Sequence, residues 1–260
     1  DSILDWLAES KSKEHRASAN RTLLFPYLLS DLLMCIYESL EASRKGKITP
    51  SYILIRKPLQ ENLFLLERIF LDEMDFSEKY SNSPLDLRPK TAGGIDGHVK
   101  QIQQVIKELR KEDCFDAEFI AKLRYSKEVG FDGLCNKAIH LFTEHKSIKT
   151  EPYNTNFIFM NENKIRIYWR YLYSFLPYLL IYIHTLVENI MEKIAITGEE
   201  YMQYFFRRNA ALTLMWASQS EEDHFIFTDY HEKLFSTIRT LLNSHCQEHN
   251  YRKPWKKDLS

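Results

Sequence analysis

Two polar side chains suited to catalysis, Asn136 and His140, stand four residues apart in a mostly apolar stretch. In a helix this spacing places both side chains on one face, a single turn apart. An imidazole can transfer protons near neutral pH, and Lys137 adds a cation on a neighbouring face. These residues are the first candidate site. The competing interpretation is that His140 is a hydrogen-bonded core residue, which is common on apolar helical faces.

A second charged pair, Arg56 and Glu61, lies within an apolar stretch that we expect to be helical from about residue 50 to 71. An unpaired charge in a helical core is costly, so Arg56 should have an acidic or carbonyl partner. A spacing of five residues is poor for an ion pair in a regular helix. Glu61 becomes a reasonable partner if Pro58 kinks or breaks the helix. A purely structural salt bridge between helices is the alternative.

These residues give the chain a resemblance to a known superfamily. Arg56 and Glu61 on one long helix, then Asn136 and His140 ahead of a long apolar helix, resemble the HEPN-type families of helical nucleases. Those families carry an Arg-Asn-x-x-x-His pattern. The resemblance extends over about residues 50–195.

The resemblance implies both a fold and a reaction. HEPN-type families occur in bacterial defence and toxin–antitoxin systems, and active members resemble metal-independent endoribonucleases with a composite site between two protomers. His140 would then act in proton transfer, and the motif arginine would stabilise phosphate charge. Cys135 occupies the arginine position here, so Arg56 would have to supply the cation. Lys137 and Glu61 are the expected binding residues. The implied partners are RNA, a second copy of the chain, and a protein such as an antitoxin, without cofactor or metal.

The composition is globular and favours helices. Hydrophobic residues make up 44% and charged residues 27%, with only 7 Gly and 8 Pro.

The net charge of −1 provides no global attraction to nucleic acid or to an anionic membrane, which leaves a local basic patch as the remaining possibility. Four cysteines lie far apart, and Cys35 and Cys135, within apolar patterns, are expected to be reduced core thiols. No secretion signal is visible, so we expect a cytoplasmic protein. Residues 171–187 are almost wholly apolar, but Pro177 and His184 favour a buried core helix over a membrane span.

Apolar residues at helical spacing predict an all-α bundle of long antiparallel helices. The longest predicted helices cover about 17–44, 50–71 and 165–196, and shorter ones cover about 98–111, 116–128, 133–145, 197–218 and 228–245. No strong linker divides the chain, so we expect one domain over 1–260. The segment 81–97 holds three of the seven glycines and is expected to be an exposed, mobile loop. The basic tail 250–260 is expected to fray.

Two functional hypotheses follow. The first is a HEPN-like, dimeric, RNA-directed protein of toxin–antitoxin or phage-defence type. The second is a non-catalytic helical interaction or scaffold protein that binds a partner through aromatic surface or through segment 81–97. The cysteine at position 135 and the near-zero net charge favour the second. The sequence alone leaves open whether the chain is an enzyme.

Overall fold

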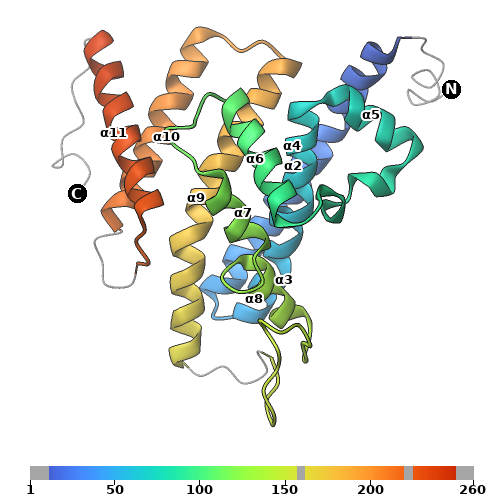
Figure 1. Ribbon diagram of the computed structural model, residues 1–260. Coiled ribbons are helices and arrows are strands. Elements are labelled where there is room, and N and C mark those ends of the chain that lie inside the picture. The colour runs from blue at the N-terminus through green and yellow to red at the C-terminus, as the bar shows by residue number, and fades with distance from the viewer. Residues whose placement is uncertain (1–11, 157–161, 220–224, 250–260) are drawn as a thin grey trace. The chain divides into compact units, whose positions relative to one another are not determined.

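The computed structural model describes residues 12–156, 162–219 and 225–249, and within these ranges the regular structure is helical, with no β-strand (Figure 1). The all-α prediction is therefore confirmed. The tail predicted at 250–260 lies outside the described residues.

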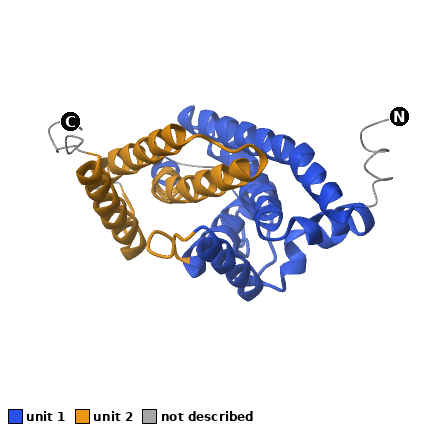
Figure 2. Ribbon diagram, turned by 90° about the horizontal axis from the view of Figure 1, so that it is seen from above, with its two compact units in different colours: residues 1–109, 117–166 blue, residues 110–116, 167–260 orange. Residues whose placement is uncertain are grey.

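The chain divides into two compact units (Figure 2). Unit 1 comprises residues 1–109 and 117–166, and unit 2 comprises residues 110–116 and 167–260. Both units are discontinuous in sequence, which explains why composition gave no sign of a linker between them. A single domain over 1–260 stays a prediction.

Unit 1 opens with a helical hairpin made of α2 (Lys13–Arg44) and α3 (Ile48–Lys57). The Ser12 hydroxyl caps α2 by accepting a hydrogen bond from the His15 backbone N–H at 3.3 Å. This cap starts the helix earlier than predicted, because residues 13–16 are helical instead of a connection. Gly46, with φ +73°, lies in the turn between the helices, where a left-handed residue can end one.

The predicted distortion at Pro58 is confirmed. Residues Pro58–Asn62 form a π-helical turn, η1, between α3 and α4 (Leu63–Leu71), and the Leu63 N–H donates to the Pro58 carbonyl. Proline has no N–H to give to the preceding turn, so the backbone is free to widen here. The wider turn brings Arg56 Nη1 to 3.6 Å from Glu61 Oε1, the ion pair that a regular helix disfavours.

The remaining elements of unit 1 are short. They are α5 (Glu73–Asn82), the 3₁₀ turns η2 (Pro84–Leu87) and η3 (Pro89–Ala92), α6 (Ile95–Glu108), α7 (Ala117–Tyr125) and α8 (Phe131–Ile139). Segment 81–97 is largely exposed, as predicted, except for the buried Leu87. It is more regular than a loop, since it holds both 3₁₀ turns and the start of α6. Its mobility stays a prediction.

A buried arginine joins the helices of unit 1. The Arg124 side chain on α7 is 0% exposed, and its Nη1 lies 2.5 Å from Glu67 Oε1 on α4, whose side chain is 1% exposed. Arg124 Nε also donates to the Leu59 carbonyl of η1 at 2.7 Å, and Nη2 donates to the Tyr125 hydroxyl at 2.7 Å. Gln101 of α6 donates to the second Glu67 oxygen at 3.0 Å. The guanidinium and its partners therefore tie α4, α6, α7 and η1 together.

Unit 2 contains most of α9 (Glu162–Ile194) together with α10 (Glu199–Gln219) and α11 (Asp229–Glu248). Its core includes His231, which is 0% exposed and whose Nε2 lies 2.9 Å from the Ser174 carbonyl. Trp216 packs edge-on against Phe235 with ring centroids 4.9 Å apart. Thr228 and His231 form a capping box at the start of α11.

Two described helices, α2 and α9, are long and apolar enough to cross a membrane by length and composition. Within the most apolar 18-residue stretch of α9, 61% of the residues are buried, as expected for a core helix. In the corresponding stretch of α2, 22% are buried. Neither value establishes a location for the protein.

We predict that Arg124→Met destabilises the fold by about 3–5 kcal/mol, because it leaves the Glu67 carboxylate buried without its cation. The double variant Arg124→Met/Glu67→Met should lose less unfolding free energy than the single variant, because neither charge then remains buried. Urea unfolding of the three proteins measures both effects. A single variant within about 1 kcal/mol of wild type would contradict the role given to this pair.

Candidate ligand-binding site

The three predicted catalytic residues do not meet in one cleft, because Asn136 and His140 lie at the end of α8, whereas Arg56 lies on α3. Helix α8 ends at Ile139, and His140 has an extended backbone with φ −109° and ψ 130°. The predicted continuation of the helix to 145 is therefore wrong, and the argument that Asn136 and His140 share one helical face does not apply. The reason is a contact with a later segment: Asn156 donates its amide to the His140 carbonyl at 3.0 Å and its backbone N–H to the Leu141 carbonyl at 2.9 Å, which holds the chain out of the helix. His140 is exposed.

Asn136 is occupied with its own helix. Its side-chain amide donates to the Asp132 backbone carbonyl at 2.7 Å and to Asp132 Oδ1 at 2.8 Å. Cys135, at the position where the HEPN pattern has arginine, is 0% exposed. Burial raises the pKa of its thiol, the Asp132 charge adds to that rise, and the Arg56 charge partly opposes it. The motif position thus faces the core, with Arg56 close enough to influence it electrostatically.

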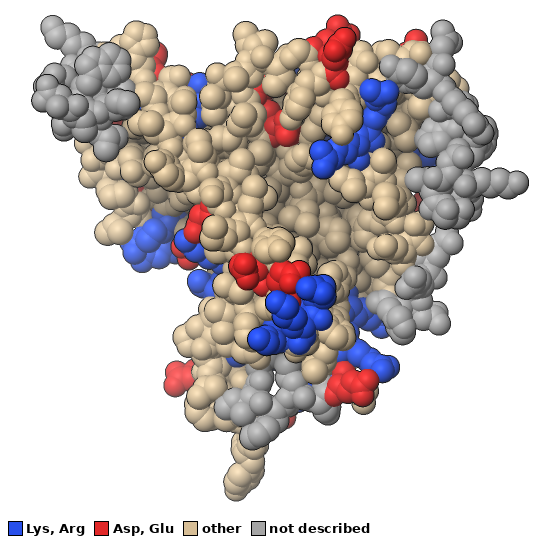
Figure 3. Space-filling view, turned by 180° about the vertical axis from the view of Figure 1, so that it is seen from behind, with Lys and Arg blue, Asp and Glu red and all other residues tan. Residues whose placement is uncertain are grey.

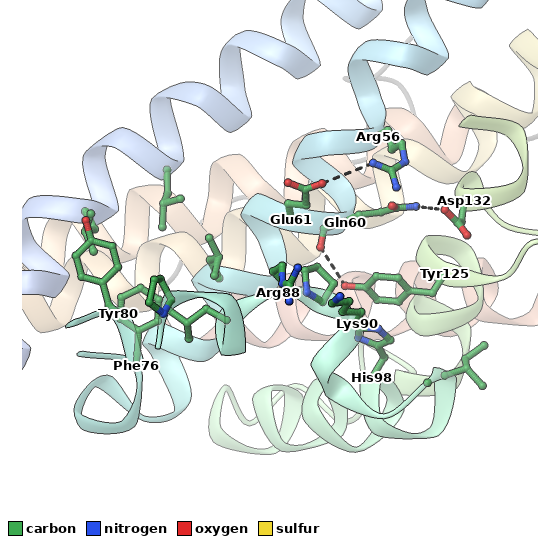
Figure 4. Close-up of a pocket in the computed structure, with 18 residues that line it drawn as sticks. Arg56, Gln60, Glu61, Phe76, Tyr80, Arg88, Lys90, His98, Tyr125 and Asp132 are labelled. Carbon is green, nitrogen blue, oxygen red and sulfur yellow. Dashed lines mark hydrogen bonds and ion pairs between the residues drawn. The ribbon is translucent and has the colours of Figure 1, made fainter. Parts of the chain in front are cut away.

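A cavity of about 700 Å³ lies in unit 1 (Figure 4). Among the sequence-predicted site residues, Arg56 and Glu61 line it, whereas Asn136, Lys137 and His140 do not. The structure therefore separates the two predicted charged groups: the α3–η1 pair belongs to the cavity, and the α8 residues lie elsewhere. Cavities of this size accommodate drug-sized molecules.

Segment 81–97 forms one side of the cavity, through residues that include Leu87, Arg88 and Lys90. Glycines set its path. Gly93 and Gly94 both have positive φ, +85° and +83°, a conformation that side chains other than glycine disfavour. At Gly97 a Cβ would lie 1.6 Å from the Ala92 carbonyl oxygen, so only glycine fits this close approach. The glycine-rich composition that predicted a loop therefore shapes a binding wall.

The two ends of the cavity differ in character. Phe76 and Tyr80 of α5 lie at one end in Figure 4 and stack with ring centroids 6.1 Å apart. Arg56, Gln60 and Asp132 lie at the other end. There Gln60 donates its amide to Asp132 Oδ1 at 2.6 Å. A molecule that spans the cavity would meet aromatic carbon at one end and hydrogen-bonding groups at the other.

His98 of α6 is the most unusual group in the wall. It is only 6% exposed, stacks on Tyr125 with ring centroids 3.6 Å apart, and meets the edge of Phe64 at 5.7 Å. Within the described residues its ring nitrogens have no hydrogen-bond partner. Neither ring nitrogen is among the fully buried, unpartnered atoms of the described residues, so the imidazole is open to the cavity and can hydrogen-bond to a ligand there.

The His98 ring is held neutral. Burial lowers the pKa of His98 to about 4, and the nearby Arg124 charge contributes in the same direction. Tyr125, beneath it, donates its hydroxyl to the Gln60 carbonyl at 3.3 Å, and burial raises the pKa of this phenol. A neutral imidazole offers one N–H donor and one nitrogen acceptor to the cavity.

Sequence reasoning missed His98, Arg124 and Tyr125. A signal for His98 was present, because it shares a helical face with the buried Ile102 and Val105. No sequence signal indicated that the short helices between α4 and α7 would place these residues beside α4 and η1.

Comparisons with protein-family models, with curated proteins and with solved structures find no match for this chain.

We predict that acid destabilises this protein partly through His98. The unfolded histidine has a pKa of about 6.5, above the folded value, so the unfolded state takes up a proton first as the pH falls. The neutral ring thus contributes stability above about pH 6.5, and this contribution disappears as the pH falls towards 4. Between pH 7 and pH 5 the loss should be about 2 kcal/mol.

His98→Gln removes this titration and should reduce the pH dependence of the unfolding free energy by that amount. Urea unfolding at the two pH values measures it, with the exposed His15→Gln as the control substitution. The same pH dependence in His98→Gln and wild type would show that the pKa of His98 is the same in the folded and unfolded states.

Proposed function

We propose that this protein is a non-catalytic helical binding protein that holds a small molecule in the unit 1 cavity. The observation that supports this most directly is His98, a buried and neutral imidazole in the cavity wall that has no hydrogen-bond partner among the described residues. The ring packs against Tyr125 and Phe64 in the fold, and its nitrogens remain available to a bound molecule.

The cavity suits binding better than chemistry. Glu61 faces Arg56, Asp132 accepts from Gln60, and His98 is neutral. Cys135, the nearest cysteine to this network, is a buried thiol with a raised pKa, which disfavours the reactive thiolate. The groups of the wall that could transfer protons are therefore engaged or positioned as hydrogen-bond partners.

The wall also has the composition of a ligand site. Apolar side chains from α2, α4 and α5 surround a few polar groups, which is the usual arrangement in pockets for small molecules. Segment 81–97, which the sequence suggested as a partner-binding element, contributes part of this wall.

The neutral fluorophore N-phenyl-1-naphthylamine tests the proposal because it reports an apolar site without requiring charge. We expect saturable binding at one molecule per chain. Leu24→Trp places a large ring into the cavity from α2 and should weaken binding by about tenfold. Leu23→Trp is the matched control, since Leu23 is also half-buried on α2 but does not line the cavity. Equal binding by both variants would contradict the proposal, as would no binding by the wild type.

A second candidate function is that of the HEPN-like, RNA-directed protein of bacterial defence or toxin–antitoxin type, acting as a homodimer. One observation favours it: the Arg56 charge reaches Cys135, the position of the missing motif arginine, so a cation is available beside the motif from another helix. His140 is exposed and Lys137 precedes it by three residues. Against it, Figure 3 shows a face on which basic and acidic side chains lie in small mixed groups, without a broad basic surface for a phosphate backbone.

If this second function holds, His140→Ala abolishes RNA cleavage by the purified protein while changing the unfolding free energy by less than about 0.5 kcal/mol, since the residue is exposed. Gel-based cleavage assays and thermal unfolding of the same preparations measure both effects. His145→Ala, another exposed histidine, should keep full activity. A wild type that leaves RNA intact as a monomer and as a dimer ends this candidate.

A further inference from the structure

The cavity wall carries an excess of one positive charge. Three cations line it, Arg56, Arg88 and Lys90, together with two carboxylates, Glu61 and Asp132. His98 adds no charge, because its pKa is lowered to about 4. A wall with this balance is best neutralised by a ligand that bears a single negative charge.

The excess positive charge of the cavity wall lies on segment 81–97. Arg56 is within 3.6 Å of Glu61, whereas Arg88 and Lys90 make no ion pair within the described residues. Arg88 uses its Nε to donate to the Leu85 carbonyl at 2.9 Å, which orients the guanidinium and leaves its terminal nitrogens for another acceptor. In Figure 4 these two side chains lie away from the Phe76–Tyr80 end.

Most of the other residues in the wall are apolar. Leu24 and Leu28 of α2, Leu65 of α4 and the stacked Phe76 and Tyr80 provide hydrocarbon and aromatic surface. A small hydrophilic anion would leave this surface wetted and would bury little area. The ligand should therefore combine one anionic group with an apolar body.

We infer that the cavity binds an amphipathic monoanion, a carboxylic acid with an apolar chain or ring. Its carboxylate lies at Arg88 and Lys90, with His98 as a neutral hydrogen-bond donor, and its apolar body extends towards Phe76 and Tyr80. This inference rests on the proposed binding function and adds the chemical class of the ligand.

Net charge distinguishes a carboxylate ligand from a phosphate monoester or an alcohol with the same apolar body. A phosphate monoester carries up to two negative charges near neutral pH, which would exceed the single positive excess and would meet Glu61 and Asp132 in the same wall. A neutral alcohol would bury the same hydrocarbon but would leave Arg88 and Lys90 without a counter-charge.

Displacement of N-phenyl-1-naphthylamine from the 260-residue protein by decanoate, decan-1-ol and decyl phosphate tests the inference, because the three compounds share one alkyl chain and differ in charge. Below their aggregation concentrations, decanoate should displace the dye at concentrations about tenfold lower than either of the others. Arg88→Gln and Lys90→Gln should each weaken decanoate about fivefold and leave decan-1-ol unchanged. Lys107→Gln, an exposed lysine of α6 outside the cavity, is the matched control and should behave as wild type.

The outcomes separate the inference from the function on which it rests. Equal displacement by decanoate and decan-1-ol, or unchanged decanoate binding in both charge variants, overturns the monoanion assignment while leaving an apolar binding site. Stronger displacement by decyl phosphate overturns it in favour of a dianion. Failure of the dye itself to bind the wild type, or dye binding that Leu24→Trp leaves intact, overturns the binding function and the inference together.

Discussion

The buried guanidinium of Arg124 is the interaction on which unit 1 depends. A charge with no exposed surface must be matched inside the protein, and Arg124 meets this requirement through Glu67, the Leu59 carbonyl and the Tyr125 hydroxyl. Each partner belongs to an element that also borders the cavity or supports its wall. The arginine thus fixes the relative positions of η1, α4 and α7, and Tyr125 in turn supports His98 by stacking.

The same charge affects the chemistry of the cavity. Arg124 lies near enough to His98 to oppose protonation of the imidazole, in addition to the effect of burial. A cationic His98 would increase the positive charge of the wall. The neutral ring leaves Arg88 and Lys90 as the cations without ion-pair partners in the described part of the cavity. Structural and binding groups are therefore coupled through one buried side chain.

The proline in the α3–α4 region has a comparable effect. Pro58 leaves the preceding turn without one N–H donor, and the π-helical turn that begins there places Arg56 within ion-pair distance of Glu61 at a spacing that a regular helix disfavours. The same turn offers its Leu59 carbonyl to Arg124 and its Gln60 carbonyl to Tyr125. One irregular turn thus contributes both to the core network and to the cavity wall, a common association of π-helical turns with functional sites.

The sequence by itself determined the helical class, the long helices near 17–44, 50–71 and 165–196, and the distortion at Pro58, because these follow from local spacing and from the missing proline N–H. It also indicated Arg56 with Glu61. Only the tertiary structure decided that α8 ends at Ile139, because Asn156, far along the chain, bonds to the carbonyls beyond it. Tertiary structure likewise brought His98, Arg88 and Lys90 to one cavity with Arg56. These residues lie on different elements, and the spacing of residues within a single helix does not predict how separate elements pack together.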